Sequence, residues 1–323
     1  MIAVGTRYNT TQIPSFGPVP QEGRIWHSTD GVTWDDITPR RTFADASLFE
    51  AFVDHSDRVV VIGTVDDGRS ELPMAWQSTD GISWKVAADG SVPPGYVGTV
   101  EQGAVGYAAL TSIGAGTEAW ISADGEAWQR SITAQPEGWF SDIGAGAEGF
   151  VITGARAPNQ DIVLASSDGV RWFESADPPP AALVAPMGGD WFAVGRGLAD
   201  GNRAQESTPV WFSANGLDWE QVGEHPLVAR PVAAPDCPEW VGGLHHAGGV
   251  LVTGTFLRYP CGEGRGIPHA TQRMSLDGAS WETILEPGAS GASQGAIFAT
   301  GEHDGAVVLV GKDGAAASFW MLR

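Results

Sequence analysis

Short apolar runs recur along the whole chain, and most of them end in glycine or another small residue. Clear examples are residues 60–64 and 150–154, and further runs lie near 107–110, 191–195, 251–254 and 307–311. Apolar runs of this length between glycines predict strands. Each run follows another strand-like segment, such as 140–146, and precedes two more. The pattern therefore predicts repeated groups of four strands.

A seven-residue motif, here called the box, connects the third and fourth strands of these groups. It reads Ser-x-Asp/Asn-Gly-x-x-Trp, and its six copies are centred on Asp30, Asp80, Asp124, Asp168, Asn215 and Asp277. Asp-Gly and Asn-Gly are strong hairpin signals, because glycine adopts positive φ without steric cost. The Asp or Asn oxygen can accept backbone N–H groups of its own turn, and the serine hydroxyl can join it. We therefore predict that the box residues are structural turn residues.

The box resembles the Asp-box, or BNR repeat, of sialidase-like β-propellers, whose pattern is S-x-D-x-G-x-x-W. In all six copies here the residue between Asp and Gly is absent, so the turn is one residue tighter. The resemblance covers nearly the whole chain and implies a β-propeller. It implies little about activity, because in that family the box lies away from the active site.

The repeat spacing predicts how many blades the chain forms. Successive box residues are 44 to 62 positions apart, which suits four-stranded blades. Residues 1–6 read as the second strand of a blade, and residues 318–322 as a third strand with no box after it. We therefore predict an all-β fold, a seven-bladed β-propeller of four-stranded antiparallel blades with incomplete terminal blades. It would form a single domain over 1–323, with blades at about 1–38, 46–87, 96–131, 139–175, 182–222, 240–284 and 293–323.

The charge balance narrows the choice of partners. The chain has 18 Lys and Arg against 39 Asp and Glu, a formal net charge of −21. This argues against nucleic acid, which needs a basic footprint, and against anionic membrane surfaces. The sequence has no run of 18 apolar residues, so we expect no membrane insertion. Residues 1–5 lack the features of a signal peptide, and we expect a signal segment to be absent from this chain.

The two cysteines bear on location. Cys237 and Cys261 lie at nearly equal distances from the predicted turn at Gly248 and Gly249. They could face each other within the separation that a disulfide needs, although two unpaired thiols are the alternative. A bridge would indicate an oxidising compartment, so we predict an extracytoplasmic protein, secreted or on the cell surface.

Candidate catalytic residues are scarce. The sialidase resemblance implies an arginine cluster, a Tyr/Glu nucleophile pair and an acid on the inner strands, yet no predicted inner strand carries the arginines. Arg41 and Arg230 lie in connections between blades, where they could form a small basic cluster or simply be solvated. His245 and His246 are adjacent on one strand and point to opposite faces, which argues against a metal site. We therefore assign no catalytic residue, metal or cofactor.

One set of residues favours binding. Three predicted inner strands begin with a large aromatic residue, namely Tyr96, Trp139 and Trp240. They could form a platform for a sugar or peptide on the face with the long loops, or they could pack between blades. The acids Asp45, Glu101, Asp142 and Glu239 nearby favour neutral or cationic ligands.

These features predict a binding function and no catalysis. We expect a non-catalytic, extracytoplasmic binding or interaction propeller that uses its long-loop face, acts as a monomer and takes a protein or a neutral glycan. Two alternatives stay open. One is a divergent sialidase-like glycoside hydrolase. The other is an assembly factor for a membrane complex, because propellers resembling the photosystem II assembly factors carry similar repeats.

Overall fold

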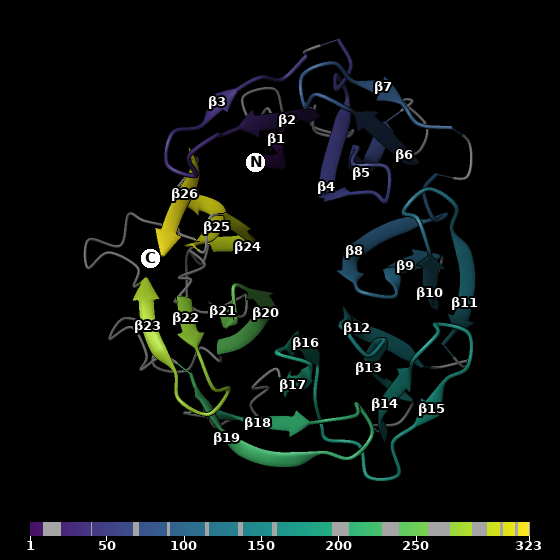
Figure 1. Ribbon diagram of the computed structural model, residues 1–323, viewed down its shortest axis with the longest axis vertical. Coiled ribbons are helices and arrows are strands. Elements are labelled where there is room, and N and C mark those ends of the chain that lie inside the picture. The colour runs from purple at the N-terminus through teal and green to yellow at the C-terminus, as the bar shows by residue number, and fades with distance from the viewer. Residues whose placement is uncertain are drawn as a thin grey trace, which may run out of the picture. The chain divides into compact units, whose positions relative to one another are not determined.

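The described residues of the computed structural model form an all-β fold (Figure 1). They are 1–8, 21–39, 41–66, 71–88, 91–113, 116–134, 138–156, 160–195, 207–227, 239–257, 272–285, 296–303, 306–313 and 316–322. The all-β prediction is confirmed. No helix among these residues is long and apolar enough to cross a membrane.

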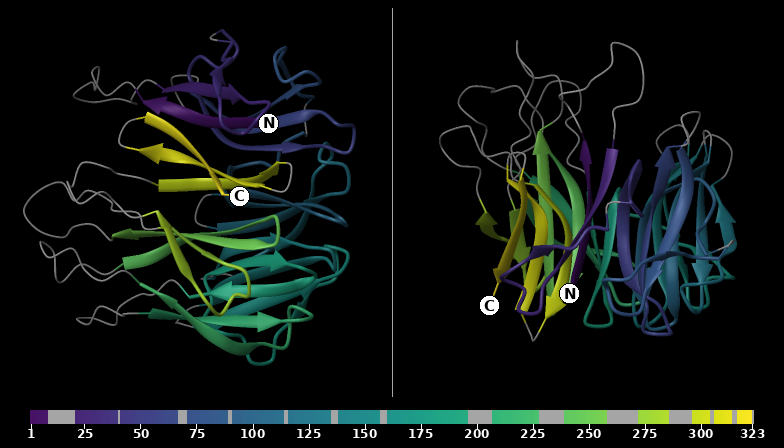
Figure 2. Two further views of the ribbon diagram at one scale, coloured as in Figure 1. Left: turned by 60° about the vertical axis from the view of Figure 1, so that its left-hand side comes forward. Right: turned by 90° about the horizontal axis from the view of Figure 1, so that it is seen from above.

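Five sheets have four antiparallel strands each, joined in chain order (Figure 2). They are β4 (Ala46–Val53), β5 (Val59–Asp66), β6 (Glu71–Ser78) and β7 (Lys85–Val86); β8 (Tyr96–Gly103), β9 (Gly106–Ile113), β10 (Gly116–Ser122) and β11 (Gln129–Thr133); β12 (Trp139–Ala145), β13 (Phe150–Arg156), β14 (Gln160–Ser166) and β15 (Phe173–Glu174); β16 (Leu183–Met187), β17 (Asp190–Val194), β18 (Ser207–Ser213) and β19 (Glu220–Pro226); and β20 (Glu239–Ala247), β21 (Val250–Leu257), β22 (Gln272–Ser275) and β23 (Glu282–Leu285).

The sheets at the two ends of the chain have three strands each. They are β1 (Ile2–Tyr8), β2 (Gln21–His27) and β3 (Asp35–Asp36), and β24 (Ala296–His303), β25 (Ala306–Asp313) and β26 (Ala316–Leu322). The 26 strands of the described residues are too few for seven four-stranded blades. The prediction of seven blades is therefore wrong, and the fold is a six-bladed β-propeller. The error arose because the pattern of apolar runs counted a partial sheet at either end as a blade.

The contacts divide the chain into two compact units. Unit 1 comprises Met1–Phe150 with Ser166–Arg171, and unit 2 comprises Val151–Ala165 with Trp172–Arg323. The single domain over 1–323 stays a prediction, and each unit is described by itself.

The core of unit 1 explains why the second strands are continuously apolar. Along β5, Val60 and Ile62 pack into one buried cluster with Val97 and Tyr107, whereas Val61 packs into another with Trp76. Because successive side chains of a strand point to opposite faces, both faces of this sheet are buried. The phenol of Tyr107 donates a hydrogen bond of 2.7 Å to the carbonyl oxygen of Val53, so it is satisfied within the core.

Unit 2 is built on the same principle. Phe192 and Val194 of β17 belong to one buried cluster, with Leu244 and Leu251. Trp191, on the opposite face of β17, belongs to another buried cluster. The second strands of both units are therefore sandwiched between two apolar layers, which the glycine-bounded runs of the sequence indicated.

Several first strands contain a β-bulge. The register shifts between Leu48 and Glu50 in β4 and between Val97 and Thr99 in β8, and comparable shifts occur in β20 and β24. A bulge inserts one extra residue and re-aims the side chains that follow it. These irregularities decide which residues of the first strands share a face.

Candidate functional site

The side-chain oxygens of the boxes are engaged within their own turns. In the second box, Asp80 Oδ1 accepts hydrogen bonds from the backbone N–H groups of Ile82 (2.8 Å) and Ser83 (2.6 Å) and from the Ser78 hydroxyl (2.9 Å). The same pair of backbone donors, two and three residues later, serves Asp30, Asp124, Asp168, Asn215 and Asp277.

This bonding is reflected in the acidity of the box carboxylates. The backbone N–H groups of Thr33 and Val32 lower the pKa of Asp30 to about 2. The glycine of each box has positive φ, for example +70° at Gly81, and the Trp84 indole N–H donates to the Gly81 carbonyl oxygen at 3.1 Å. A box carboxylate held in this way is a turn cap, and its bonded oxygen is not available for acid–base chemistry.

The aromatic residues predicted at the start of inner strands are exposed in unit 1. Tyr96 is 50% exposed at the first residue of β8, and Trp139 is 45% exposed at the first residue of β12. The bulge residue Phe49 of β4 lies against Tyr96, with ring centroids 4.8 Å apart. We call Phe49, Tyr96 and Trp139 the aromatic rim. Trp240 is the second residue of β20 in unit 2, and its side chain lies outside the described part.

Three carboxylates lie on the same three strands. Glu50, Glu101 and Asp142 come from β4, β8 and β12, and β8 contacts both β4 and β12. Their side chains are neither fully buried nor fully exposed. We call these three residues the acidic strip, and the strip together with the aromatic rim the inner-strand site. Figure 1 shows β4, β8 and β12 succeeding one another in unit 1.

The electrostatics of the acidic strip are unfavourable. Loss of surrounding water raises the pKa of Glu50 to about 7. The pKa of Glu101 is raised well above its usual range, first by loss of water and then by repulsion from Asp142 and Glu50. Like charges that cannot be solvated fully destabilise one another. Protonation or a positively charged ligand therefore stabilises the acidic strip.

The bulge in β8 brings one rim residue and one strip residue to the same face. Tyr96 pairs with Ser112 of β9, and Glu101 pairs with Ala108. Ser112 and Ala108 are four positions apart, an even number, so they point to the same face of the sheet, and so do the residues paired with them. Tyr96 and Glu101 therefore share a face although they are five positions apart, because the bulge adds one residue between them. At 3.3 Å per residue, four positions place the two about 13 Å apart along the strand. A ligand that touches both must be elongated.

The remaining predicted site residues do not belong to β4, β8 or β12, or they lie outside the described residues. Arg41 is exposed in the turn before β4. Arg230, Cys237 and Cys261 lie outside the described residues, so the basic cluster and the disulfide stay predictions. Sequence reasoning missed Glu50 and Phe49. Glu50 carried a usable signal, because it is the only charged residue of a largely apolar strand.

Two histidines of unit 2, His225 and His245, are packed in the described part of the chain. His225 is fully buried, and its Nε2 lies 2.6 Å from the Thr253 hydroxyl oxygen. The centroids of the His225 and Trp281 rings are 4.7 Å apart. Burial lowers the pKa of His245 to about 4. Within the described ranges, no group of three or more His, Cys, Asp or Glu side chains is arranged to hold a metal ion.

Comparison with known proteins shows the fold class. No family model matches the chain, and no curated protein matches it in sequence. Among solved structures, the chain is similar to the β-propeller domain of the Trilobed protease from Pyrococcus furiosus, with 9% identity, TM-score 0.51, and coverage of 86% of this chain and 81% of that one. It is also similar to YCF48 bound to a D1 peptide, with 12% identity, TM-score 0.51, and coverage of 91% and 84%. A third structure is the polysaccharide lyase Uly1, with 11% identity, TM-score 0.50, and coverage of 80% and 70%.

These similarities, at identities of 9% to 12%, show a β-propeller fold. The fold occurs in enzymes and in proteins that bind a peptide, so the function must be argued from the site.

Proposed function

We propose that the chain is a non-catalytic binding module whose inner-strand site takes an elongated protein segment carrying a positively charged side chain. The observation that carries this proposal is the acidic strip of Glu50, Glu101 and Asp142 on strands that begin with exposed aromatic residues. An ammonium or guanidinium group pairs with carboxylates and also with aromatic faces.

The energetics favour a cation in the strip. A cation close to Glu101 would offset the repulsion from Asp142 and Glu50 that raises its pKa. The chain's net charge of −21 would also attract such a ligand from a distance and repel acidic ones. The same argument disfavours carboxylated sugars and therefore the sialidase-type substrate.

The rim supplies the second contact. Large aromatic side chains that are about half exposed are common anchors for peptides. An extended peptide that contacts Tyr96 with one residue would reach Glu101 with a basic residue roughly four or five positions further along. The similarity to YCF48, solved with a D1 peptide bound, supports a peptide as a ligand that this fold can accept. The assembly-factor alternative is one form of such peptide binding.

The proposal includes a location and an oligomeric state. We place the protein outside the cytoplasm, because a bridge between Cys237 and Cys261 would require an oxidising compartment. We expect a monomer in which one chain provides the whole inner-strand site.

The test is a binding screen with extended peptides. Peptides with an aromatic residue and a Lys or Arg four or five positions apart should bind, and versions with Glu in place of the basic residue should not. Glu101→Gln and Trp139→Ala should each weaken binding about tenfold, the size of one charged or aromatic contact. Glu148→Gln, an exposed turn residue, is the matched control. Binding that ignores the basic residue, or that survives both variants, would contradict the proposal.

One observation favours a second candidate, a glycoside hydrolase. A carboxyl group whose pKa is about 7, such as Glu50, can act as a general acid at neutral pH, and a second carboxylate on the neighbouring strand could be its partner. Aryl glycosides of neutral sugars test this directly. Turnover that is lost in both Glu50→Gln and Glu101→Gln would replace the binding proposal with a catalytic one.

A further inference from the structure

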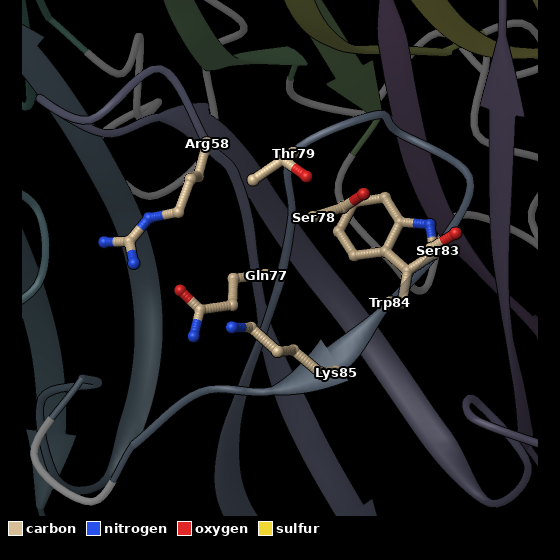
Figure 3. Close-up of a pocket in the computed structure, with 7 residues that line it drawn as sticks. All are labelled: Arg58, Gln77, Ser78, Thr79, Ser83, Trp84 and Lys85. Atoms are coloured by element: carbon tan, nitrogen blue, oxygen red, sulfur yellow. The ribbon is translucent and has the colours of Figure 1, made fainter.

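An open cavity of about 280 Å³ lies beside the second box in unit 1. It is lined by Arg58, Gln77, Ser78, Thr79, Ser83, Trp84 and Lys85 (Figure 3). We propose that this cavity is a second ligand site, independent of the inner-strand site, and that it takes an uncharged polyhydroxylated ligand of the size of a single sugar ring.

The sheet register brings the polar side chains together. Gln77 of β6 and Lys85 of β7 are directly paired across the ladder, so their side chains project from the same face. Gln77 also pairs with Val60, and Arg58 stands two residues before Val60. Figure 3 shows the ends of the Gln77 and Lys85 side chains close together, with Arg58, from the segment just before β5, to one side. Within the described part of the chain, the side chains of Gln77 and Lys85 form no hydrogen bond or ion pair, so both retain donors for a ligand.

Arg58 forms a fixed wall of the cavity. Its Nε donates to Asp54 Oδ2 at 2.8 Å, and its Nη2 contacts Glu126 of the third box. Asp54 is 3% exposed and also accepts the backbone N–H groups of Ser56 and Arg58, each at 2.9 Å. Such a network holds the guanidinium in one orientation.

The charges around the cavity indicate an uncharged ligand. The positive charge of Arg58 faces two carboxylates, Asp54 and Glu126, and Lys85 supplies the second positive charge. The charges of Arg58, Lys85, Asp54 and Glu126 sum to zero, so the cavity attracts neither anions nor cations. The net charge of −21 disfavours an anion further.

The hydrogen-bonding groups suit hydroxyls. The Lys85 ammonium only donates, whereas the Gln77 amide and the Thr79 hydroxyl can both donate and accept. The Ser83 hydroxyl, which hydrogen-bonds Asp80, can still accept. A sugar hydroxyl does both as well. At about 30 Å³ per water, 280 Å³ has room for roughly nine water molecules, which corresponds to a ligand of about ten heavy atoms. Trp84 supplies an apolar wall, as small-molecule sites usually have.

The other repeats serve as internal controls. At the position of Lys85, immediately after the box tryptophan, they carry Asp35, Gln129, Phe173, Glu220 and Glu282. At the position of Gln77 they carry His27, Ile121, Ala165, Phe212 and Met274. The residue after Arg58, Val59, pairs with the box serine Ser78. In the third repeat, Tyr107 pairs with the box serine Ser122, so Gly106 occupies the position of Arg58. Residues needed for the hairpin would recur, and this polar combination occurs only once. The hairpin therefore does not explain it.

The experiment is a titration of the full chain with single sugars, followed by saturation-transfer NMR. The probes are D-glucose, D-galactose, D-mannose and N-acetyl-D-glucosamine, with D-glucuronate and inorganic sulfate as anionic counterparts. At least one neutral sugar should bind with a millimolar Kd, and both anions should bind at least about tenfold more weakly. Gln77→Ala and Lys85→Ala should each weaken the neutral sugar about tenfold, since each loses a hydrogen bond to the ligand.

Gln129→Ala, at the corresponding position of the third repeat, is the matched control and should bind like the parent. Both cavity residues can be changed without loss of any internal hydrogen bond, so unchanged melting temperatures verify the fold. Arg58 is left intact, because its removal would leave the buried Asp54 unpaired. The inference is overturned if none of the four sugars binds up to about 50 mM, if an anion binds more tightly than all of them, or if both alanine variants bind like Gln129→Ala. Glu101→Gln should not alter sugar binding, which separates this site from the proposed function.

Discussion

Replacing Glu50 by glutamine should stabilise the protein at alkaline pH but not at acidic pH. The pKa of Glu50 rises from its ordinary value of 4.5 to about 7 in the folded protein because water is lost around it. A carboxyl group whose pKa is raised on folding binds its proton more tightly in the folded state. Its ionisation therefore costs stability as the pH rises from 4.5 through 7, and the cost is complete above both values.

The magnitude follows from the two pKa values. One pKa unit corresponds to about 1.4 kcal/mol, so the rise amounts to about 3.5 kcal/mol at most. Because Glu50 is only partly buried, water screens the charge, and we expect about 1–3 kcal/mol. Glutamine has nearly the same shape and cannot ionise. Glu50→Gln should therefore equal the parent protein at pH 4 and exceed its free energy of unfolding by about 1–3 kcal/mol at pH 8.5.

Urea unfolding followed by circular dichroism at several pH values measures this difference. Glu148→Gln, in an exposed turn of the same unit, controls for the loss of one negative charge. If Glu50→Gln shows no pH-dependent advantage over Glu148→Gln, the carboxyl group of Glu50 is well solvated. The electrostatic argument for a cationic ligand would then lose its basis.

Three further predictions concern the core, the cysteines and activity. Trp76→Ala should lower the free energy of unfolding by about 3–5 kcal/mol in urea titrations, because the side chain is 1% exposed and packs in the core of unit 1; a loss under about 1 kcal/mol would contradict that packing. Intact-mass analysis after alkylation should show Cys237 and Cys261 protected until reductant is added, and two alkylated thiols in the unreduced, denatured sample would exclude the bridge. A fluorogenic sialoside should not be turned over, since the acidic strip repels carboxylated sugars; turnover that Arg41→Ala or Arg230→Ala abolishes would show the opposite.

Part of the candidate site was visible in the sequence and part was not. The exposed positions of Tyr96 and Trp139 follow a repeat rule, eleven residues before the apolar start of the next strand, so periodicity alone located them. Phe49 also lies eleven residues before an apolar start, that of the run 60–64, but it is the extra residue of a bulge inside β4 and not the first residue of that strand. The sequence also indicated Glu101 and Asp142 as acids near the site, but not that they and Glu50 act on one another.

By itself, the sequence determined the hairpins and the strand type of this protein. A box uses only seven consecutive residues, so its turn geometry and the two backbone hydrogen bonds to its Asp or Asn oxygen are local and recur in every copy. The apolar second strands are equally readable, because burial on both faces leaves an unbroken apolar run. Only the tertiary structure decided which first strands lie side by side, where their bulges fall and how the sheets group into units. Those features depend on packing between segments far apart in the chain, and a single extra residue in a bulge reverses the faces that the alternation of the sequence predicts.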